Sequence, residues 1–513
     1  MPDLKKESRR LAPPQGGEGV GGEGVGAEGV GGEGVRRPTT TRRPSEATWR
    51  RWLLLALFAL AAIAAVRILL APRPGALTED ELDYLRAAVH LAREGVLWHG
   101  PIEDPAGEGD AYREPGYSAA LAATWRMSGV DLGFAEDEFA AAPGAADARR
   151  AAATLHLALL GVAAAAAAGA VAGLGGGEIP TAVAAIAVLA SPALVHSSSS
   201  LASENLAVPL VAIGGAALVA TVGGAGVLAP LVGGLASGLL PLVRGAGIVA
   251  APVGIALLLI WPRALGRRAR ALRVGLFALP ALLLPGLWMT RNLAVVGHPV
   301  IADRGGVVLQ VRLELDRQLA EEGLVPAFLE WTPLAASGRL RERVAPDSRL
   351  SSFRWHRDGN YFTRAIGRWR ARLATSRDPI EVDRALRREA VAGFFSSPGE
   401  HLAAIPVVGW RGLFTERSPA AAGIFDLRLP IGLGLLAGCL LLLLRGLQFR
   451  DPRPLALLAL PIGLFVFHAG ATEFLPRFGL PGLPLVWAAT VAALAGLPAK
   501  SDSGPGPGLP SGR

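Results

Sequence analysis

The stretch AAATLHLALLGVAAAAAAGAVAGL, residues 151–174, contains no charged side chain and is the clearest indication of the fold class. A helix of about 20 apolar residues crosses the roughly 30 Å hydrocarbon core of a bilayer. Together with similar apolar runs, this stretch predicts an all-α polytopic membrane protein with about ten transmembrane helices. The predicted spans are residues 52–72, 151–174, 180–197, 203–222, 226–243, 246–262, 274–290, 429–445, 454–470 and 478–498.

The composition of the whole chain agrees with a membrane protein. Of its 513 residues, 51% are hydrophobic, and the mean hydropathy is +0.38. A net charge of +8 could suit nucleic acid, but no recognised binding motif accompanies the charge. Much of the arginine instead lies in the N-terminal tail and between apolar runs, where it fixes membrane orientation. The single cysteine, Cys439, excludes an intramolecular disulfide.

The two ends of the chain differ from its apolar middle. Residues 16–35 read GGEGVGGEGVGAEGVGGEGV, a repeat of Gly-x-Glu-Gly-Val. Glycine at this density costs too much chain entropy to order, and one valine per repeat cannot form a core. We therefore expect residues 1–51 to be a disordered cytoplasmic tail rather than a signal peptide. Residues 52–498 form the transmembrane domain, and 499–513 form a second disordered cytoplasmic tail.

Arginines between the apolar runs predict the orientation. The loops PRALGRRARALR (262–273) and RGLQFRDPRP (445–454) and the N-terminal tail fall on one side if there are ten spans. Short loops rich in arginine stay in the cytoplasm. We therefore expect a multi-pass protein of the cell membrane with both termini cytoplasmic. The long segments 73–150 and 291–428 then lie outside, and the apolar segment 115–129 is too short to span and should be a juxtamembrane helix.

Polar residues gather at the extracytoplasmic ends of the predicted spans. Charge at membrane depth is costly and commonly marks function, although a scatter of solvated edge residues is the alternative. In TEDELDY (78–84), Thr78 could simply cap a helix, but this explains only one or two of the four acids that follow. The residues concerned are Asp80, Glu81, Tyr84, Arg113, Glu204, Arg244, Arg291, Asn292, His468 and Arg477.

The order and spacing of these residues resemble the GT-C glycosyltransferases, in particular the bacterial relatives of protein O-mannosyltransferases and lipid A aminoarabinose transferases. The resemblance covers about residues 50–498, without much of 300–395. Its elements are Asp80-Glu81 with Tyr84 and Ala88, Arg113-Glu114-Pro115-Gly116-Tyr117, Glu204, Arg244 after Leu-Val, Trp288-x-x-Arg291-Asn292, and Arg477-Phe478-Gly479-Leu480-Pro481. Phe478 stands where the family usually has tyrosine.

The resemblance implies transfer of a hexose or pentose from a polyprenyl-phosphate donor to a lipid, glycan or protein acceptor, with inversion. Because phosphate is a good leaving group, such a site needs a base for the acceptor and positive charge for the phosphate. We expect Asp80 to be the base, with its pKa raised at the membrane edge, and Glu81 to orient it. The expected substrate contacts are Tyr84, Arg113, Glu204, Arg244, Arg291, Asn292, His468 and Arg477.

The sequence also bears on cofactors and on other classes of function. No cluster of histidine and cysteine has the spacing of a metal site, so no metal ligand and no required cofactor is predicted. The carboxylates could hold a divalent cation, but nothing in the sequence requires one. Two alternatives stay open, a transporter or flippase for lipid-linked sugar and a non-catalytic envelope assembly protein. A transporter would show internal repeats and charges near the midplane, neither of which is seen.

Overall fold

The structure is a computed structural model of the chain. It describes residues 77–497 apart from 106, 140–144, 262–265, 334–349, 355–356, 377 and 416–426, together with the isolated residues Ala62 and Val66. The chain divides into two compact units, Met1–Trp49 and Arg50–Arg513, and every described residue belongs to the second unit. The tails predicted at 1–51 and 499–513 lie outside the described residues, and so does nearly all of the predicted span 52–72.

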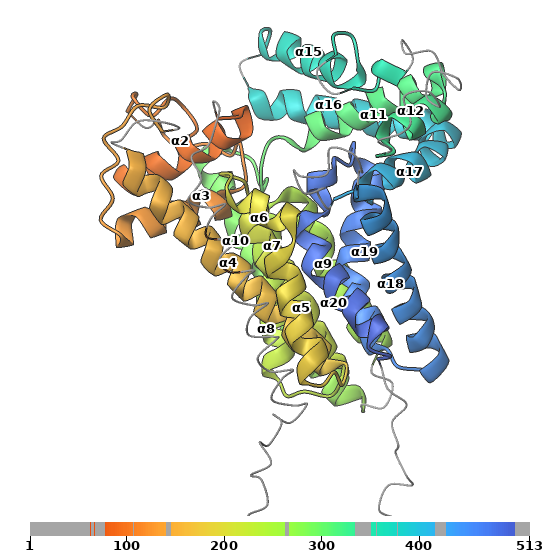
Figure 1. Ribbon diagram of the computed structural model, residues 1–513. Coiled ribbons are helices and arrows are strands. Elements are labelled where there is room, and N and C mark those ends of the chain that lie inside the picture. The colour runs from red at the N-terminus through yellow and green to blue at the C-terminus, as the bar shows by residue number, and fades with distance from the viewer. Residues whose placement is uncertain are drawn as a thin grey trace, which may run out of the picture. The chain divides into compact units, whose positions relative to one another are not determined.

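The described residues form helices and no strand, which confirms the helical fold class (Figure 1). In chain order the elements are α2 (Glu79–Arg93), α3 (Pro115–Met127), α4 (Ala146–Gly173), α5 (Glu178–Ala190), α6 (Pro192–Ser198), α7 (Glu204–Val222), α8 (Leu228–Val243), the 3-10 helix η2 (Gly245–Val249), α9 (Ala250–Ile260), α10 (Arg267–Val296), α11 (Gly305–Glu322), α12 (Leu324–Trp331), α15 (Tyr361–Leu373), α16 (Pro379–Ser396), α17 (Pro398–Gly412), α18 (Arg428–Phe449), α19 (Arg453–Ala471), the 3-10 helix η3 (Pro476–Gly482) and α20 (Leu483–Leu494).

Fewer helices are long and apolar enough to cross a membrane than the ten expected from the sequence. Within the described residues there are 6, namely α4, α7, α10, α18, α19 and the segment Pro476–Leu494. The pair α5 and α6 counts as a seventh if it is one span bent by 52°. The bend falls at Ser191, because the residue before a proline is pushed out of the helical region.

The predicted spans 226–243 and 246–262 are the main departures. They correspond to α8, with 16 residues, and to η2 followed by α9. At 1.5 Å per residue, α8 is about 24 Å long, which is shorter than the hydrocarbon core. The chain leaves the helix at Arg244, whose backbone is extended at φ −154 and ψ 122. The apolar runs therefore predicted the helices correctly but overestimated their lengths.

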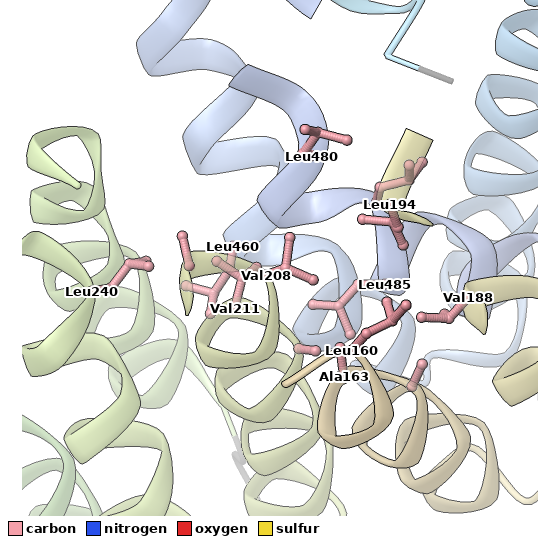
Figure 2. Close-up of a cluster of buried hydrophobic side chains, with 14 of the residues drawn as sticks. Leu160, Ala163, Val188, Leu194, Val208, Val211, Leu240, Leu460, Leu480 and Leu485 are labelled. Carbon is pink, nitrogen blue, oxygen red and sulfur yellow. The ribbon is translucent and has the colours of Figure 1, made fainter. Parts of the chain in front are cut away.

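Small and branched apolar side chains fill the space between the central helices. Figure 2 shows Leu160 of α4, Val208 and Val211 of α7, Leu460 of α19 and Leu485 of α20 in one buried cluster. Since lipid tails are as apolar as leucine, association of membrane helices depends on close contact more than on hydrophobic burial. The buried alanines of α4 allow this close contact with α7 and α5.

Arginines close one end of the helices. Arg273 Nη1 donates to the Thr221 carbonyl oxygen at 2.6 Å, and Arg453 Nη1 donates to that of Gly173 at 3.0 Å. Arg445 donates in the same way to the carbonyl oxygen of Ala493. The last carbonyls of a helix have no partner within it, so these side chains satisfy the ends of α7, α4 and α20. The described arginines of the two basic loops therefore lie at one end of the helices.

The opposite end carries α2 and α3. Thr78 and Glu81 form a capping box that starts α2, and Glu114 precedes Pro115 in the first turn of α3. The segment expected as a short juxtamembrane helix is α3, which packs against α2 and α4. Trp125 Nε1 donates to the Ala148 carbonyl oxygen at 2.9 Å and so fixes α3 to the start of α4.

The segment after α10 forms a helical group whose core includes residues of α19 and of the loop after it. It comprises α11, α12, α15, α16 and α17, of which α11 and α17 pack against α19 (Figure 1). Arg370 of α15 lies 3.8 Å from Glu79 of α2. Asp383 of α16 starts α11, because its Oδ1 accepts from the backbone nitrogens of Gly306 at 2.6 Å and Val307 at 3.1 Å. Leu315 and Phe353 are buried in the core. This part of the chain, mostly outside the resemblance, is therefore folded where it is described.

Close contact between α8 and α10 gives a first prediction. A Cβ atom at Gly238 would collide with the carbonyl oxygen of Pro280, and one at Gly234 with that of Phe277. We expect Gly234→Ala and Gly238→Ala each to lower the free energy of unfolding by about 1–3 kcal/mol, as overpacking commonly does. Thermal unfolding of the purified chain in detergent measures this loss. Gly275→Ala on α10, with nothing within 4 Å, is the control, and equal melting temperatures for all three would contradict the contact.

Candidate functional site

Asp80 contacts arginines from two distant segments of the chain. It stands in the first turn of α2, where Arg113 Nη2 pairs with its Oδ1 atom. Arg477 Nη2, in η3, lies 2.7 Å from its Oδ2 atom. Both carboxylate oxygens of Asp80 are thus held by charge-assisted hydrogen bonds, which are the stronger kind. This contact joins residues that lie 397 positions apart.

Asp83 extends the cluster by one helical turn. Arg113 Nε donates to Asp83 Oδ2 at 2.7 Å, so one guanidinium group bridges Asp80 and Asp83. Arg304 Nη1 lies 3.4 Å from the same Asp83 oxygen and brings in the segment before α11. Tyr84 is buried under the arginine, with the Arg113 Cζ atom 5.1 Å from its ring centroid. Asp80, Asp83 and Tyr84 can all contact Arg113 because residues three and four positions apart lie on one face of α2.

A second ion pair lies beside the first. Arg244 Nη1 is 2.9 Å from Glu204 Oε1, and Arg477 Nε is 3.9 Å from the same atom. The Phe478 ring lies against both cations, with its centroid 4.6 Å from the Arg244 Cζ atom and 5.7 Å from that of Arg477. Cations on an aromatic face are attracted by its quadrupole. We call Asp80, Asp83, Glu204, Arg113, Arg244, Arg304 and Arg477 the charged cluster.

The charged cluster changes the expected chemistry of Asp80. Burial raises the pKa of Asp80, but the charges of Arg113, Arg477 and Arg304 outweigh it and hold the pKa well below its usual range. The expectation of a raised pKa was therefore wrong, since it considered the membrane edge and not the arginines. Asp80 is ionised at every physiological pH in this arrangement.

Glu81 and His468 lie close to the charged cluster in other roles. Glu81 Oε2 accepts from the Thr78 backbone nitrogen at 3.1 Å, and its Oε1 accepts from that of Leu201 at 3.1 Å. It therefore ties the start of α2 to the segment before α7. His468 of α19 is buried with its ring 5.0 Å from that of Phe478. The predicted functional roles of both residues remain predictions.

Arg291 and Asn292 contact backbone carbonyl oxygens, and their predicted role in substrate binding remains a prediction. Arg291 Nη1 donates to the Asp110 carbonyl oxygen at 2.9 Å, and Asn292 Nδ2 donates to that of Val300 at 2.7 Å. The Arg291 Cζ atom also lies 4.8 Å from the Trp288 ring centroid. These contacts tie the end of α10 to two loops. Among the described residues, neither side chain is paired with a member of the charged cluster.

Asp83 and Arg304 were missed by the sequence analysis. Asp83 could have been found, because it lies three residues after Asp80 and so on the same face of a helix. Arg304 gave no such signal, since it stands in the part of the chain outside the motif resemblance. Its approach to Asp83 depends on how the segment after α10 folds back over α2.

The charged cluster has one more arginine than carboxylates, so its chemistry suits an anion. The planar guanidinium group matches phosphate or carboxylate oxygens in a bidentate way. Within the described part of the chain, no group of three or more histidine, cysteine, aspartate or glutamate side chains is arranged to hold a metal ion. Whether a divalent cation takes part remains a prediction.

Comparisons with known proteins give a weak likeness to archaeal structures. No protein-family model and no curated protein matches the chain. The crystal structure of the Archaeoglobus fulgidus oligosaccharyltransferase in the apo form is 13% identical at a TM-score of 0.47, over 88% of this chain and 51% of that chain. The structure of archaeal oligosaccharyltransferase AglB from Archaeoglobus fulgidus in complex with an inhibitory peptide and a dolichol-phosphate is 14% identical at a TM-score of 0.47, over 87% and 50%.

The chain therefore spans about half the length of these structures. A likeness this weak is not evidence of a shared activity. Neither structure is one of the bacterial O-mannosyltransferase or aminoarabinose transferase relatives that the motifs resemble, and that finer resemblance stays a prediction.

The buried pair of Glu204 and Arg244 leads to a second prediction. Glu204 is 4% exposed, so Glu204→Gln leaves the Arg244 charge without its counter-ion in a low-dielectric site. We expect a loss of about 3–5 kcal/mol in unfolding free energy, with a smaller loss in the double variant Glu204→Gln, Arg244→Met. Thermal unfolding in detergent measures both.

Asp147→Asn serves as the control for this pair. Asp147 and Arg150 form an ion pair on the surface with side chains 68% and 71% exposed, and its loss should change stability by less than about 1 kcal/mol. The single variant Arg244→Met completes the comparison. If the double variant loses the sum of the Glu204→Gln and Arg244→Met losses, Glu204 and Arg244 are not coupled.

Proposed function

We propose that the chain is an integral membrane glycosyltransferase that moves a sugar from a polyprenyl-phosphate donor to an extracytoplasmic acceptor. The observation that supports this most is the contact of Asp80 with Arg113 and Arg477. It lies at the end of the helices away from the arginines that bond Thr221 and Gly173. The resemblance of the same residues to GT-C motifs supports the donor class and the direction of transfer.

Arg244 and Arg477 are the best placed side chains for the donor phosphate. Both guanidinium groups lie close to Glu204 Oε1, at 2.9 Å and 3.9 Å, and both lie against the Phe478 ring. They are therefore held near each other. As the bond to the sugar breaks, its electron pair passes to the phosphate, and fixed arginines stabilise that charge.

Asp80 has an electrostatic role in this proposal. A carboxylate with a low pKa is a weak base, but it keeps its negative charge throughout the reaction. Positive charge develops at the anomeric carbon during glycosyl transfer, and a permanently ionised carboxylate stabilises it. The acceptor oxygen or nitrogen attacks that carbon from the face opposite the phosphate, which inverts its configuration. The transferred sugar is a hexose or a pentose, and the acceptor is a lipid, a glycan or a protein.

The proposal includes the orientation in the cell membrane. Residues 52–72, α8, and η2 with α9 complete ten spans, which keeps both termini and the basic loops in the cytoplasm. In a Cys439→Ser background, a membrane-impermeant maleimide should label the Glu79→Cys variant in intact cells. It should label the Arg268→Cys variant only after permeabilisation. Both side chains are exposed, and the proposed orientation puts them on opposite sides of the membrane. The reverse pattern would contradict the orientation.

The activity is tested through Asp80. In cells that lack the gene, mass spectrometry of glycolipids and envelope glycans identifies the missing sugar, and restoring the gene returns it. We expect Asp80→Asn to restore about 100- to 1,000-fold less product, because one electrostatic contact at the transition state is lost. Glu79→Gln is the matched control, because Glu79 is the residue before Asp80 and its own side chain is 91% exposed.

Donor binding separates the proposal from its alternatives. Mass spectrometry of lipid that co-purifies with the chain should find polyprenyl phosphate in the Asp80→Asn variant and lose it in Arg477→Ala. Full product from Asp80→Asn would refute the role of Asp80. If reconstituted chain moved labelled lipid across vesicles and formed no glycoside, it would be a flippase. If it did neither, the assembly-protein alternative would stand.

A further inference from the structure

Glu473 is a buried acid in the loop between α19 and η3. It is 8% exposed, and the next residue, Phe474, has a left-handed backbone with φ 41. This conformation is uncommon for a residue with a large side chain, and it persists where the surroundings enforce it, commonly at functional sites. Here the Phe474 ring is 1% exposed and packs against Phe465 at 4.9 Å between centroids.

The charged and titratable groups around Glu473 come from four elements. Tyr361 of α15 hydrogen-bonds the carboxyl group, and Arg411 Nη1 of α17 lies 3.1 Å from the Tyr361 hydroxyl and 3.3 Å from the Glu473 carbonyl oxygen. Arg477 of η3 and Asp80 of α2 act on the carboxyl group through their charges. Among the described residues, the Glu473 Oε2 atom has no hydrogen-bond partner.

Asp80 and Glu473 differ in what holds their oxygens. Each Asp80 oxygen is paired with an arginine, whereas one Glu473 oxygen has no partner. We propose that Glu473 is the catalytic base that accepts the proton of the acceptor hydroxyl or amine. This inference rests on the proposed function. In the step, the acceptor atom bonds to the anomeric carbon, the carbon–oxygen bond to phosphate breaks with its electron pair on the phosphate, and the proton passes to Glu473 Oε2.

The titration of Glu473 agrees with this role. Burial raises the pKa of Glu473 to about 7, although Arg411, the Tyr361 hydrogen bond and Arg477 act in the opposite direction. A base is most effective when its pKa lies near the working pH. Two carboxylates whose environments move their pKa values apart are a known pattern for dividing such roles. The transfer rate should therefore rise about tenfold between pH 6 and pH 8, as the fraction of ionised Glu473 rises.

The test uses the purified full chain in detergent with two fractions from cells that lack the gene. The polyprenyl-phosphate lipid fraction supplies the donor, and the delipidated envelope fraction supplies a glycan or protein acceptor. We expect Glu473→Gln to lower the rate of product formation about 100- to 10,000-fold at pH 8 and to remove the rise with pH. The half-saturating amount of the lipid fraction should not change. Glu473→Asp should restore part of the rate together with the pH dependence. Glu400→Gln on α17 is the control, since Glu400 is exposed.

Two results would overturn the inference. One is a Glu473→Gln rate above half of the wild-type rate while Asp80→Asn is inactive, which leaves the proposed function standing without this base. The other is a loss of rate matched by a fall in melting temperature or by weaker saturation, which is the result of a structural role. If the wild-type chain formed no glycoside from the lipid and envelope fractions together, the proposed function itself would fail.

Discussion

An ionised carboxylate at the edge of a bilayer has to be paired, and the pairing of Asp80 organises one end of this molecule. Its two arginines come from the segment before α3 and from η3, so one side chain connects three stretches of the chain. Arg113 carries the connection on to Asp83, and Asp83 carries it to Arg304. Ion pairs thus hold together α2, the segments before α3 and α11, and η3. The spanning helices are instead held together by close contact of small apolar residues.

The same arrangement separates the properties of two acids. Asp80 is enclosed by arginines and stays ionised, whereas Glu473 faces a tyrosine and one arginine from the helical group after α10. Burial acts on both carboxyl groups in the same direction, so the number and closeness of cations decides the outcome. Tyr361 and Arg411 therefore make the helical group after α10 part of the environment of Glu473.

Apolar run lengths predicted α4, α7, α10, α18 and α19, because uninterrupted hydrophobic sequence of this length has few other stable states. They could not predict that α8 ends at Arg244 or that Ser191 bends its span. The motifs predicted Asp80, Arg113 and Arg477 as neighbours. The low pKa of Asp80 and the backbone contacts of Arg291 depend on distances between segments far apart in sequence, which neither spacing nor composition encodes.

The end of the helices that carries the two arginine-rich loops is the basic end. The hydrogen bonds of its arginines limit how the bundle can move. Arg273, Arg445 and Arg453 each fasten the end of one spanning helix to a neighbour, pairing α10 with α7, α18 with α20 and α19 with α4. A motion that separates the paired helices at this end would break these hydrogen bonds. A motion confined to the opposite end, which carries α2 and α3, would leave all three hydrogen bonds intact. The three bonds therefore make the basic end the more firmly joined end of the helices.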